Sequence, residues 1–120
     1  MAKILCVDDE LNFASTTCAI LAAAGHQAIP ATSAREAIEK LQHNTYDVVL
    51  TGWRLGDVTG RAIVQAVKDH STAPVVVLSC HVAEAFQEAE PLADLYLEKP
   101  VDLAELVAIV NELLETVSSQ

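Results

Sequence analysis

Polar residues directly follow several short apolar runs of this 120-residue chain. Asp8 and Asp9 follow the first run, Ser79 ends a later one, and Lys99 with Pro100 ends the last. Two neighbouring carboxylates can hold a hard cation such as Mg²⁺ through their charged oxygens. They can equally form a structural ion pair with a lysine. Either chemistry requires a fold that brings distant parts of the chain to one place.

Five apolar runs alternate with helix-like stretches, which predicts an α/β fold with a parallel sheet covered on both faces. The run 75–78 is continuous and β-branched, as a strand buried on both faces should be. The second run is weak and ends at Pro30, which suits an edge strand. The expected strands are residues 3–7, 26–30, 47–51, 74–79 and 94–98.

Five helices are expected between and after these strands. Gly25 should stop the first helix as a left-handed cap. Ser33 and Glu36 have the spacing of a capping box at the start of the second. The expected helices cover 11–24, begin near Ser33, Gly60 and Asp102, and include a short one at 82–90.

The segment 47–60, taken with Asp8, Asp9, Ser79 and Lys99, resembles the receiver domain of bacterial two-component response regulators. The resemblance covers essentially the whole chain, so residues 1–120 are expected to form a single domain. It implies a doubly wound, flavodoxin-like sheet of five parallel strands in the order 2-1-3-4-5. In that order the ligand crevice lies at the carboxyl ends of strands 1 and 3. The polar residues at the strand ends would therefore converge on one crevice.

Gly52 stands where this family carries the aspartate that accepts a phosphoryl group. A glycine has no carboxylate, so it cannot form an acyl phosphate. By the resemblance, Ser79 would contact the phosphoryl group, Lys99 would pair with it, and Tyr96 would be the aromatic switch residue. The sequence therefore predicts a degenerate receiver that cannot be phosphorylated, is not an enzyme, and signals through contacts with other proteins.

The same resemblance implies a Mg²⁺ site with Asp9 as a direct ligand, Asp8 as a water-mediated one, and Arg54 lending its backbone carbonyl. Without an aspartate at position 52, only two carboxylates remain, and Lys99 opposes the cation. We expect no cofactor and weak or absent Mg²⁺ binding. We expect Lys99 to pair instead with Asp8 or Asp9, and the Tyr96 rotamer to be set by neighbouring packing.

The composition argues against several other classes of protein. A formal net charge of −10 with scattered basic residues disfavours direct nucleic-acid binding. No apolar run approaches the roughly 18 residues of a membrane-spanning helix. The chain starts almost directly with a strand and leaves no room for a signal peptide, which predicts no membrane association and a cytoplasmic location. The three cysteines, Cys6, Cys18 and Cys80, lack the spacing of a metal or redox motif and are expected to be reduced thiols.

Two alternatives and several partners stay open at this stage. The chain could be an ordinary phosphoacceptor whose aspartate was changed to Gly52, or a small-ligand sensor that uses the emptied crevice. The expected partners are a histidine kinase, an effector domain, or a second copy bound through the fourth helix, the fifth strand and the last helix. Ile109 lies off the main apolar stripe of that last helix and is a candidate contact.

Overall fold

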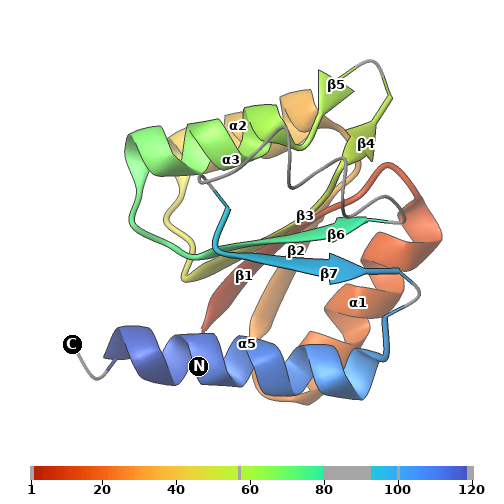
Figure 1. Cartoon of the computed structure of the whole chain (residues 1–120), viewed down its shortest axis with the longest axis vertical. Coiled ribbons are helices and arrows are strands. Elements are labelled where there is room, and N and C mark those ends of the chain that lie inside the picture. Colours follow the sequence, from red (N-terminus) through yellow and green to blue (C-terminus); the bar gives the residue numbers. More distant parts are fainter. Residues whose placement is uncertain (1, 57, 80–92, 100, 119–120) are drawn as a thin grey trace.

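Five parallel strands form the central sheet (Figure 1). The computed structural model describes residues 2–56, 58–79, 93–99 and 101–118. The sheet order is β2-β1-β3-β6-β7, which is the expected order 2-1-3-4-5 counted along the chain. Each strand lies within one residue of its expected bounds. The strands are β1 (Lys3–Val7), β2 (Gln27–Ala31), β3 (Val48–Gly52), β6 (Val75–Ser79) and β7 (Leu95–Glu98).

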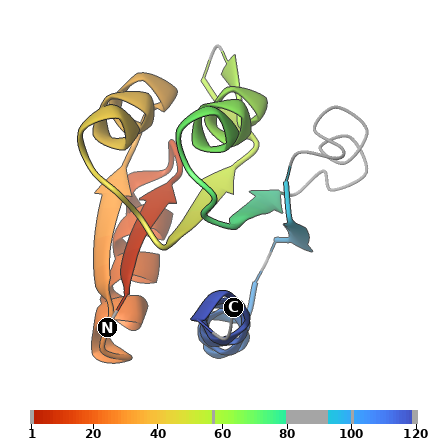
Figure 2. The same cartoon turned by 90° about the vertical axis from the view of Figure 1, so that its left-hand side faces the viewer.

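Helices cover both faces of the sheet. Helices α2 and α3 lie together on one face, and α1 and α5 lie on the other (Figures 1 and 2). The short helix expected at 82–90 falls outside the described residues. The described helices are α1 (Leu11–Ala23), α2 (Ala34–His43), α3 (Arg61–His70) and α5 (Leu103–Ser118).

The strands divide the core into two layers by simple alternation. Val75 and Val77 pack in the cluster beneath α2 and α3, whereas Val76 and Leu78 pack in the cluster beneath α1 and α5. Successive side chains of a strand point to opposite faces, so a strand buried on both faces must be apolar throughout. This explains the continuous apolar runs of the sequence.

Local signals in the sequence start and stop the helices as expected. The Ser33 hydroxyl accepts a hydrogen bond from the Glu36 backbone N–H at 3.1 Å. The Glu36 carboxylate, however, accepts from the N–H of Thr32 and not from that of Ser33. Gly25 follows α1 with a φ of 97°, the left-handed conformation that glycine adopts without penalty. Asp102 caps α5 by accepting from the Ala104 N–H at 2.9 Å.

A small antiparallel ladder between β3 and α3 was not expected from the sequence. Its strands are β4 (Arg54–Leu55) and β5 (Val58–Thr59), two residues each. Trp53 precedes the ladder and is almost completely buried in the cluster beneath α2 and α3.

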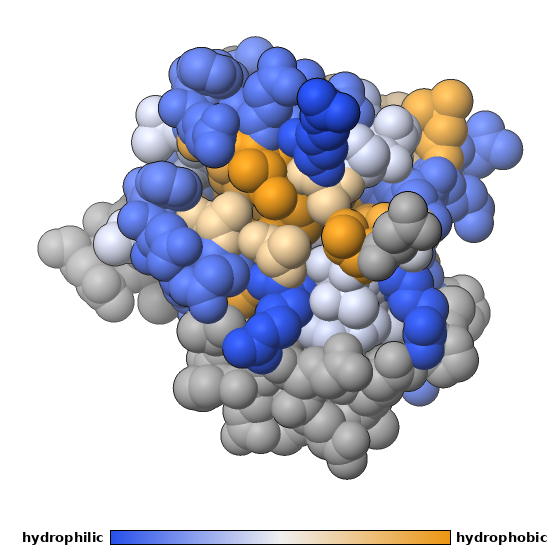
Figure 3. Space-filling view, turned by 90° about the horizontal axis from the view of Figure 1, so that it is seen from above, coloured by the Kyte–Doolittle hydropathy of each residue, from blue (hydrophilic) through white to orange (hydrophobic). Residues whose placement is uncertain are grey.

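The surface over α2 and α3 has an apolar centre within a hydrophilic rim (Figure 3). Ile38 of α2 and Ala66 of α3 are half-buried and pack against the core cluster beneath them. Among the described residues, none of the helices has the length and apolar character that crossing a membrane requires.

Candidate functional site

The carboxylate of Asp8 lies at the centre of the site, just past the carboxyl end of β1. Asp8 is only 4% exposed, although the residue that follows it, Asp9, is exposed. Its Oδ1 accepts a hydrogen bond from the Glu10 backbone N–H at 2.9 Å. A buried carboxylate is costly unless its oxygens are satisfied, so the second oxygen of Asp8 also needs a partner.

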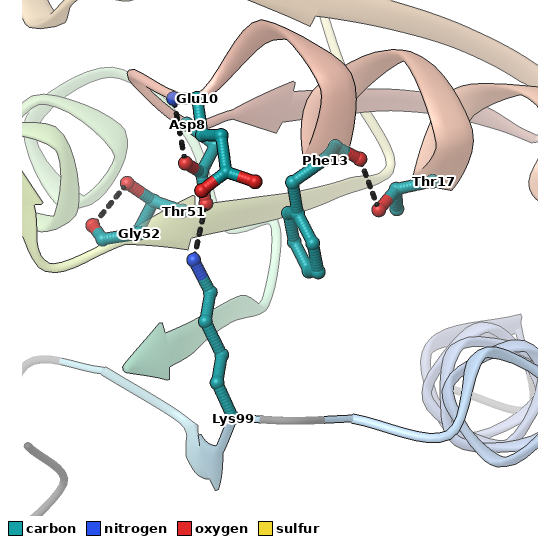
Figure 4. Close-up of polar contacts among 7 residues, drawn as sticks. All are labelled: Asp8, Glu10, Phe13, Thr17, Thr51, Gly52 and Lys99. Carbon is teal, nitrogen blue, oxygen red and sulfur yellow. Dashed lines mark hydrogen bonds and ion pairs between the residues drawn. The ribbon is translucent and has the colours of Figure 1, made fainter. Parts of the chain in front are cut away.

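Lys99, which directly follows the edge strand β7, supplies that partner. Its Nζ lies 2.6 Å from Asp8 Oδ2, and the two residues are 91 positions apart in the chain (Figure 4). The lysine side chain is 21% exposed and that of Asp8 is 6% exposed, so most of the ion pair is shielded from water. The prediction that Lys99 pairs with Asp8 or Asp9 is confirmed, with Asp8 as the partner.

Phe13 of α1 completes the surroundings of the lysine. The Lys99 ammonium lies 4.3 Å from the centroid of the Phe13 ring, within range of a cation–π interaction (Figure 4). The ammonium thus contacts a carboxylate and an aromatic ring. Sequence reasoning did not identify Phe13 as a site residue. Its only signal was its position early in the helix that follows Asp8 and Asp9.

Gly52 ends β3 directly beside this ion pair. A Cβ atom at position 52 would lie 3.2 Å from Asp8 Oδ2 and 3.6 Å from a methyl group of Leu55. The glycine backbone carbonyl accepts a hydrogen bond from the buried Thr51 hydroxyl at 2.9 Å. The end of β3 therefore faces the Asp8 carboxylate, and it brings no side chain of its own.

Two further residues named from the sequence lie at this edge of the sheet. Ser79 ends β6 and is 5% exposed. Its carbonyl accepts a hydrogen bond from the Lys99 backbone N–H at 3.0 Å, which fixes the start of the lysine side chain. Tyr96 of β7 is half-buried and packs against the cluster beneath α2 and α3. Ser79 and Lys99 thus meet through their backbones at this edge, and Tyr96 lies on β7, the strand that leads to Lys99.

The donor set of the site fits a Mg²⁺ ion poorly. Asp8 is already engaged by an ammonium, Gly52 offers no carboxylate, and Asp9 and Arg54 are exposed. Within the described part of the chain, no group of three or more His, Cys, Asp or Glu side chains is arranged to hold a metal. Mg²⁺ demands several oxygen ligands in octahedral geometry. Weak or absent Mg²⁺ binding stays a prediction.

A small cavity lies beside the ion pair, between β1 and α1. It has room for about one water molecule, and most of its lining is apolar. A ligand of metabolite size does not fit there. The lining residues are Cys6, Val7, Asp8, Phe13, Ala14, Thr17, Leu50 and Leu78.

Cys6 of β1 and Cys18 of α1 each influence the pKa of the other. The pKa of Cys18 is lowered by its interaction with the Cys6 thiol, and burial opposes part of the effect. The pKa of Cys6 is raised, first by its interaction with Cys18 and then by burial. Both described cysteines are free thiols, as expected, and Cys80 lies outside the described residues.

Comparisons of the sequence and of the structure with known proteins all point to one family, over most of the chain. The sequence profile of the family described as "Response regulator receiver domain" matches residues 4–111. Response regulator ArlR of Staphylococcus saprophyticus is 28% identical over 117 residues, which are 95% of this chain and 53% of ArlR. Transcriptional regulatory protein ZraR of Escherichia coli is 30% identical over 114 residues, which are 92% of this chain and 26% of ZraR.

The chain therefore spans about half the length of ArlR and about a quarter of ZraR. Among solved structures, the receiver domain of Francisella response regulator 1452 superimposes with a TM-score of 0.88 at 25% identity. The match covers 98% of this chain and 99% of that one.

Proposed function

Because the chain belongs to the family of response regulator receiver domains, we propose that it is a degenerate receiver that signals without being phosphorylated. Its input is not an acyl phosphate, and its output is carried by contacts with other proteins. Such a domain has no catalytic activity of its own and requires no cofactor.

One observation carries this proposal: at the end of β3, Gly52 faces an ion pair between Asp8 and Lys99 that is already formed. Asp8 and Lys99 are 2.6 Å apart, so the ammonium is neutralised by a carboxylate of the site itself. A lysine that pairs with a phosphoryl group must be available to it. Here Lys99 already has a carboxylate partner within the site, which supports a site held in one state.

The absence of a phosphoryl switch means that another interaction must set the balance between conformations. A partner protein that binds one conformation better than the other would do so, and a histidine kinase or an effector domain are the partners expected of this family. The alternative, a second copy, would bind through β7 and α5, together with the helix expected at 82–90.

The deciding experiment is incubation with acetyl phosphate followed by intact-mass spectrometry. We expect the wild-type chain to stay unmodified, since it lacks a carboxylate at position 52. The matched control is Gly52→Asp under the same conditions. One acid-labile phosphoryl adduct on the wild-type chain would overturn the proposal.

The same control separates the proposal from its first alternative. If Gly52→Asp gains a phosphoryl adduct readily, the site has kept the rest of the receiver machinery, and an ordinary phosphoacceptor that lost its aspartate becomes the better description. If the variant also stays unmodified while remaining folded, the whole site has diverged. The Asp8–Lys99 ion pair would then be the stable arrangement of the site.

Self-association is tested by sedimentation of the wild type and of Ile109→Glu. Ile109 is half-buried on α5, whereas Leu11 on α1 is 60% exposed. Leu11→Glu serves as the control, because it adds the same charge at an exposed apolar residue of another helix. A dimer that Ile109→Glu weakens and Leu11→Glu does not would place the interface on α5. Equal weakening by both variants would argue against it.

A further inference from the structure

The Lys99 ammonium lies between a carboxylate and an aromatic ring that come from one stretch of the chain. Its Nζ is 2.6 Å from Asp8 Oδ2 and 4.3 Å from the centroid of the Phe13 ring. Asp8 directly follows β1, and Phe13 lies in the first turn of α1 (Figure 4). The backbone end of the lysine is fixed as well, because its N–H donates to the Ser79 carbonyl at 3.0 Å. Both ends of this long side chain are therefore held.

Both oxygens of the Asp8 carboxylate are already in use. Oδ1 accepts a hydrogen bond from the Glu10 N–H at 2.9 Å, and Oδ2 accepts one from Lys99. Oδ2 is also the atom that a Cβ at position 52 would approach most closely, at 3.2 Å. With Gly52 at the end of β3, the lysine reaches Oδ2 without competition from a side chain there.

The surroundings of Asp8 suit an ammonium better than a hydrated divalent cation. The face of the Phe13 ring attracts an ammonium through its negative quadrupole, but it offers Mg²⁺ no oxygen ligand. Mg²⁺ loses water reluctantly and usually keeps several water molecules in its coordination shell. The cavity that Asp8 and Phe13 line together has room for about one water molecule and is mostly apolar. On this side of Asp8, the ring and the small cavity disfavour a hydrated metal.

We propose that Phe13 is a positioning residue that holds the Lys99 ammonium on Asp8, where the ammonium serves as the resident cation of the site in place of a divalent metal. This inference deepens the proposed function and rests on it, because it names a contact that keeps an unphosphorylated site in one state. Phe13 is half-buried and also packs against the cluster beneath α1 and α5, so a test must separate positioning from packing.

The first test measures Mg²⁺ affinity by isothermal titration calorimetry. It uses the Gly52→Asp chain, in which the added carboxylate should give a measurable dissociation constant, with and without Phe13→Leu. We expect Phe13→Leu to tighten Mg²⁺ binding about fivefold. That change corresponds to the loss of a cation–π contact of about 1 kcal/mol, which weakens the hold of the lysine on Asp8.

Two control variants separate the ring from general packing. Phe13→Tyr keeps an aromatic face and should keep the dissociation constant of the Gly52→Asp parent. Tyr46→Leu removes another ring that contacts a lysine, since the Lys3 ammonium lies 5.1 Å from the centroid of the buried Tyr46 ring. It should lower stability without changing Mg²⁺ affinity. The proposal is overturned if Phe13→Leu leaves the dissociation constant unchanged, or if either control changes it as much as Phe13→Leu does.

Nuclear magnetic resonance of the unaltered chain gives an independent readout that needs no variant to fold. The ring current of Phe13 should move the Lys99 Cε methylene protons upfield of those of Lys40 and Lys68, and a large excess of Mg²⁺ should leave them there. Ordinary shifts for Lys99, or a return to ordinary shifts on adding Mg²⁺, would overturn the inference. Neither test uses acetyl phosphate, so the inference and the proposed function can fail separately.

Discussion

Gly52 and Gly60 lie at the two ends of the same loop, yet the structure needs only one of them to be a glycine. Neither has a positive φ, so backbone conformation requires a glycine at neither position. At Gly60, an added Cβ would collide with the Gly52 carbonyl oxygen and lie 3.3 Å from Trp53 Cα, both of them backbone atoms. At Gly52, the nearest atom would be Asp8 Oδ2 at 3.2 Å, the far end of a side chain that can shift.

The comparison separates a glycine required by packing from one that is not. Gly60 donates its N–H to the Trp53 carbonyl at 2.5 Å as α3 begins, and this close approach of two backbone segments leaves no space for a side chain. Nothing comparable excludes a side chain at Gly52. The missing carboxylate at the end of β3 is therefore a chemical feature of this chain and not a consequence of its packing.

The largest expected effect is that of Gly60→Ala. The new methyl group must displace backbone or the buried Trp53 ring, and overpacking of this kind costs about 3 kcal/mol of unfolding free energy. Urea denaturation should show a lower midpoint with an unchanged slope. A loss close to zero would mean that the loop moves freely, and the contrast between the two glycines would disappear.

Lys99→Ala should have the next largest effect. It leaves the buried Asp8 carboxylate without its counter-ion, which costs about 2 kcal/mol at neutral pH because part of the pair is exposed to water. Thermal melts of the wild type and of the variant at neutral pH measure this loss.

Lys68→Ala is the matched control for that experiment. Lys68 pairs with Asp94 at 3.0 Å, but their side chains are 30% and 40% exposed. An exposed pair contributes less than about 1 kcal/mol. Equal losses for the two lysine variants would refute the role given to the Asp8–Lys99 pair.

Gly52→Ala should change the free energy of unfolding by less than about 1 kcal/mol. Replacing the glycine lowers the conformational entropy of the unfolded chain, which favours folding and offsets the slight crowding at Asp8. The denaturation midpoint should therefore stay close to that of the wild type, in contrast to Gly60→Ala. A large loss here would show that the end of β3 tolerates no side chain, and that packing explains the glycine after all.

The smallest effect is expected from Mg²⁺ on the wild-type chain. Trp53 is the only tryptophan and follows Gly52 directly, so its fluorescence should report a cation bound at the site. We expect no saturable change at sub-millimolar Mg²⁺, because Asp8 is already paired and one carboxylate is missing. Gly52→Asp, which adds a carboxylate, should respond more strongly. A wild-type response equal to that of the variant would contradict the prediction.

The ranges of the strands and the ends of the described helices could be predicted from the sequence because those signals are local, whereas the order of the strands in the sheet was implied by the family resemblance. Alternating and continuous apolar runs, the Ser33 cap and Gly25 all act over a few residues. The two-residue strands β4 and β5 were missed for the opposite reason. Their pairing is set by where α3 and the end of β3 place the loop, and no periodic pattern fits into two residues.

The sequence by itself determined that Gly52 provides no carboxylate and that Asp8, Asp9, Ser79 and Lys99 follow strands. Only the tertiary structure decided that Lys99 pairs with Asp8 and not Asp9, and that Phe13 covers the ammonium. The residue types determine which chemical groups the chain can bring to the site, and the local pattern determines which strand or helix carries each group. Which groups touch depends on burial and on distances across the sheet, and these exist only once strands far apart in the chain lie side by side.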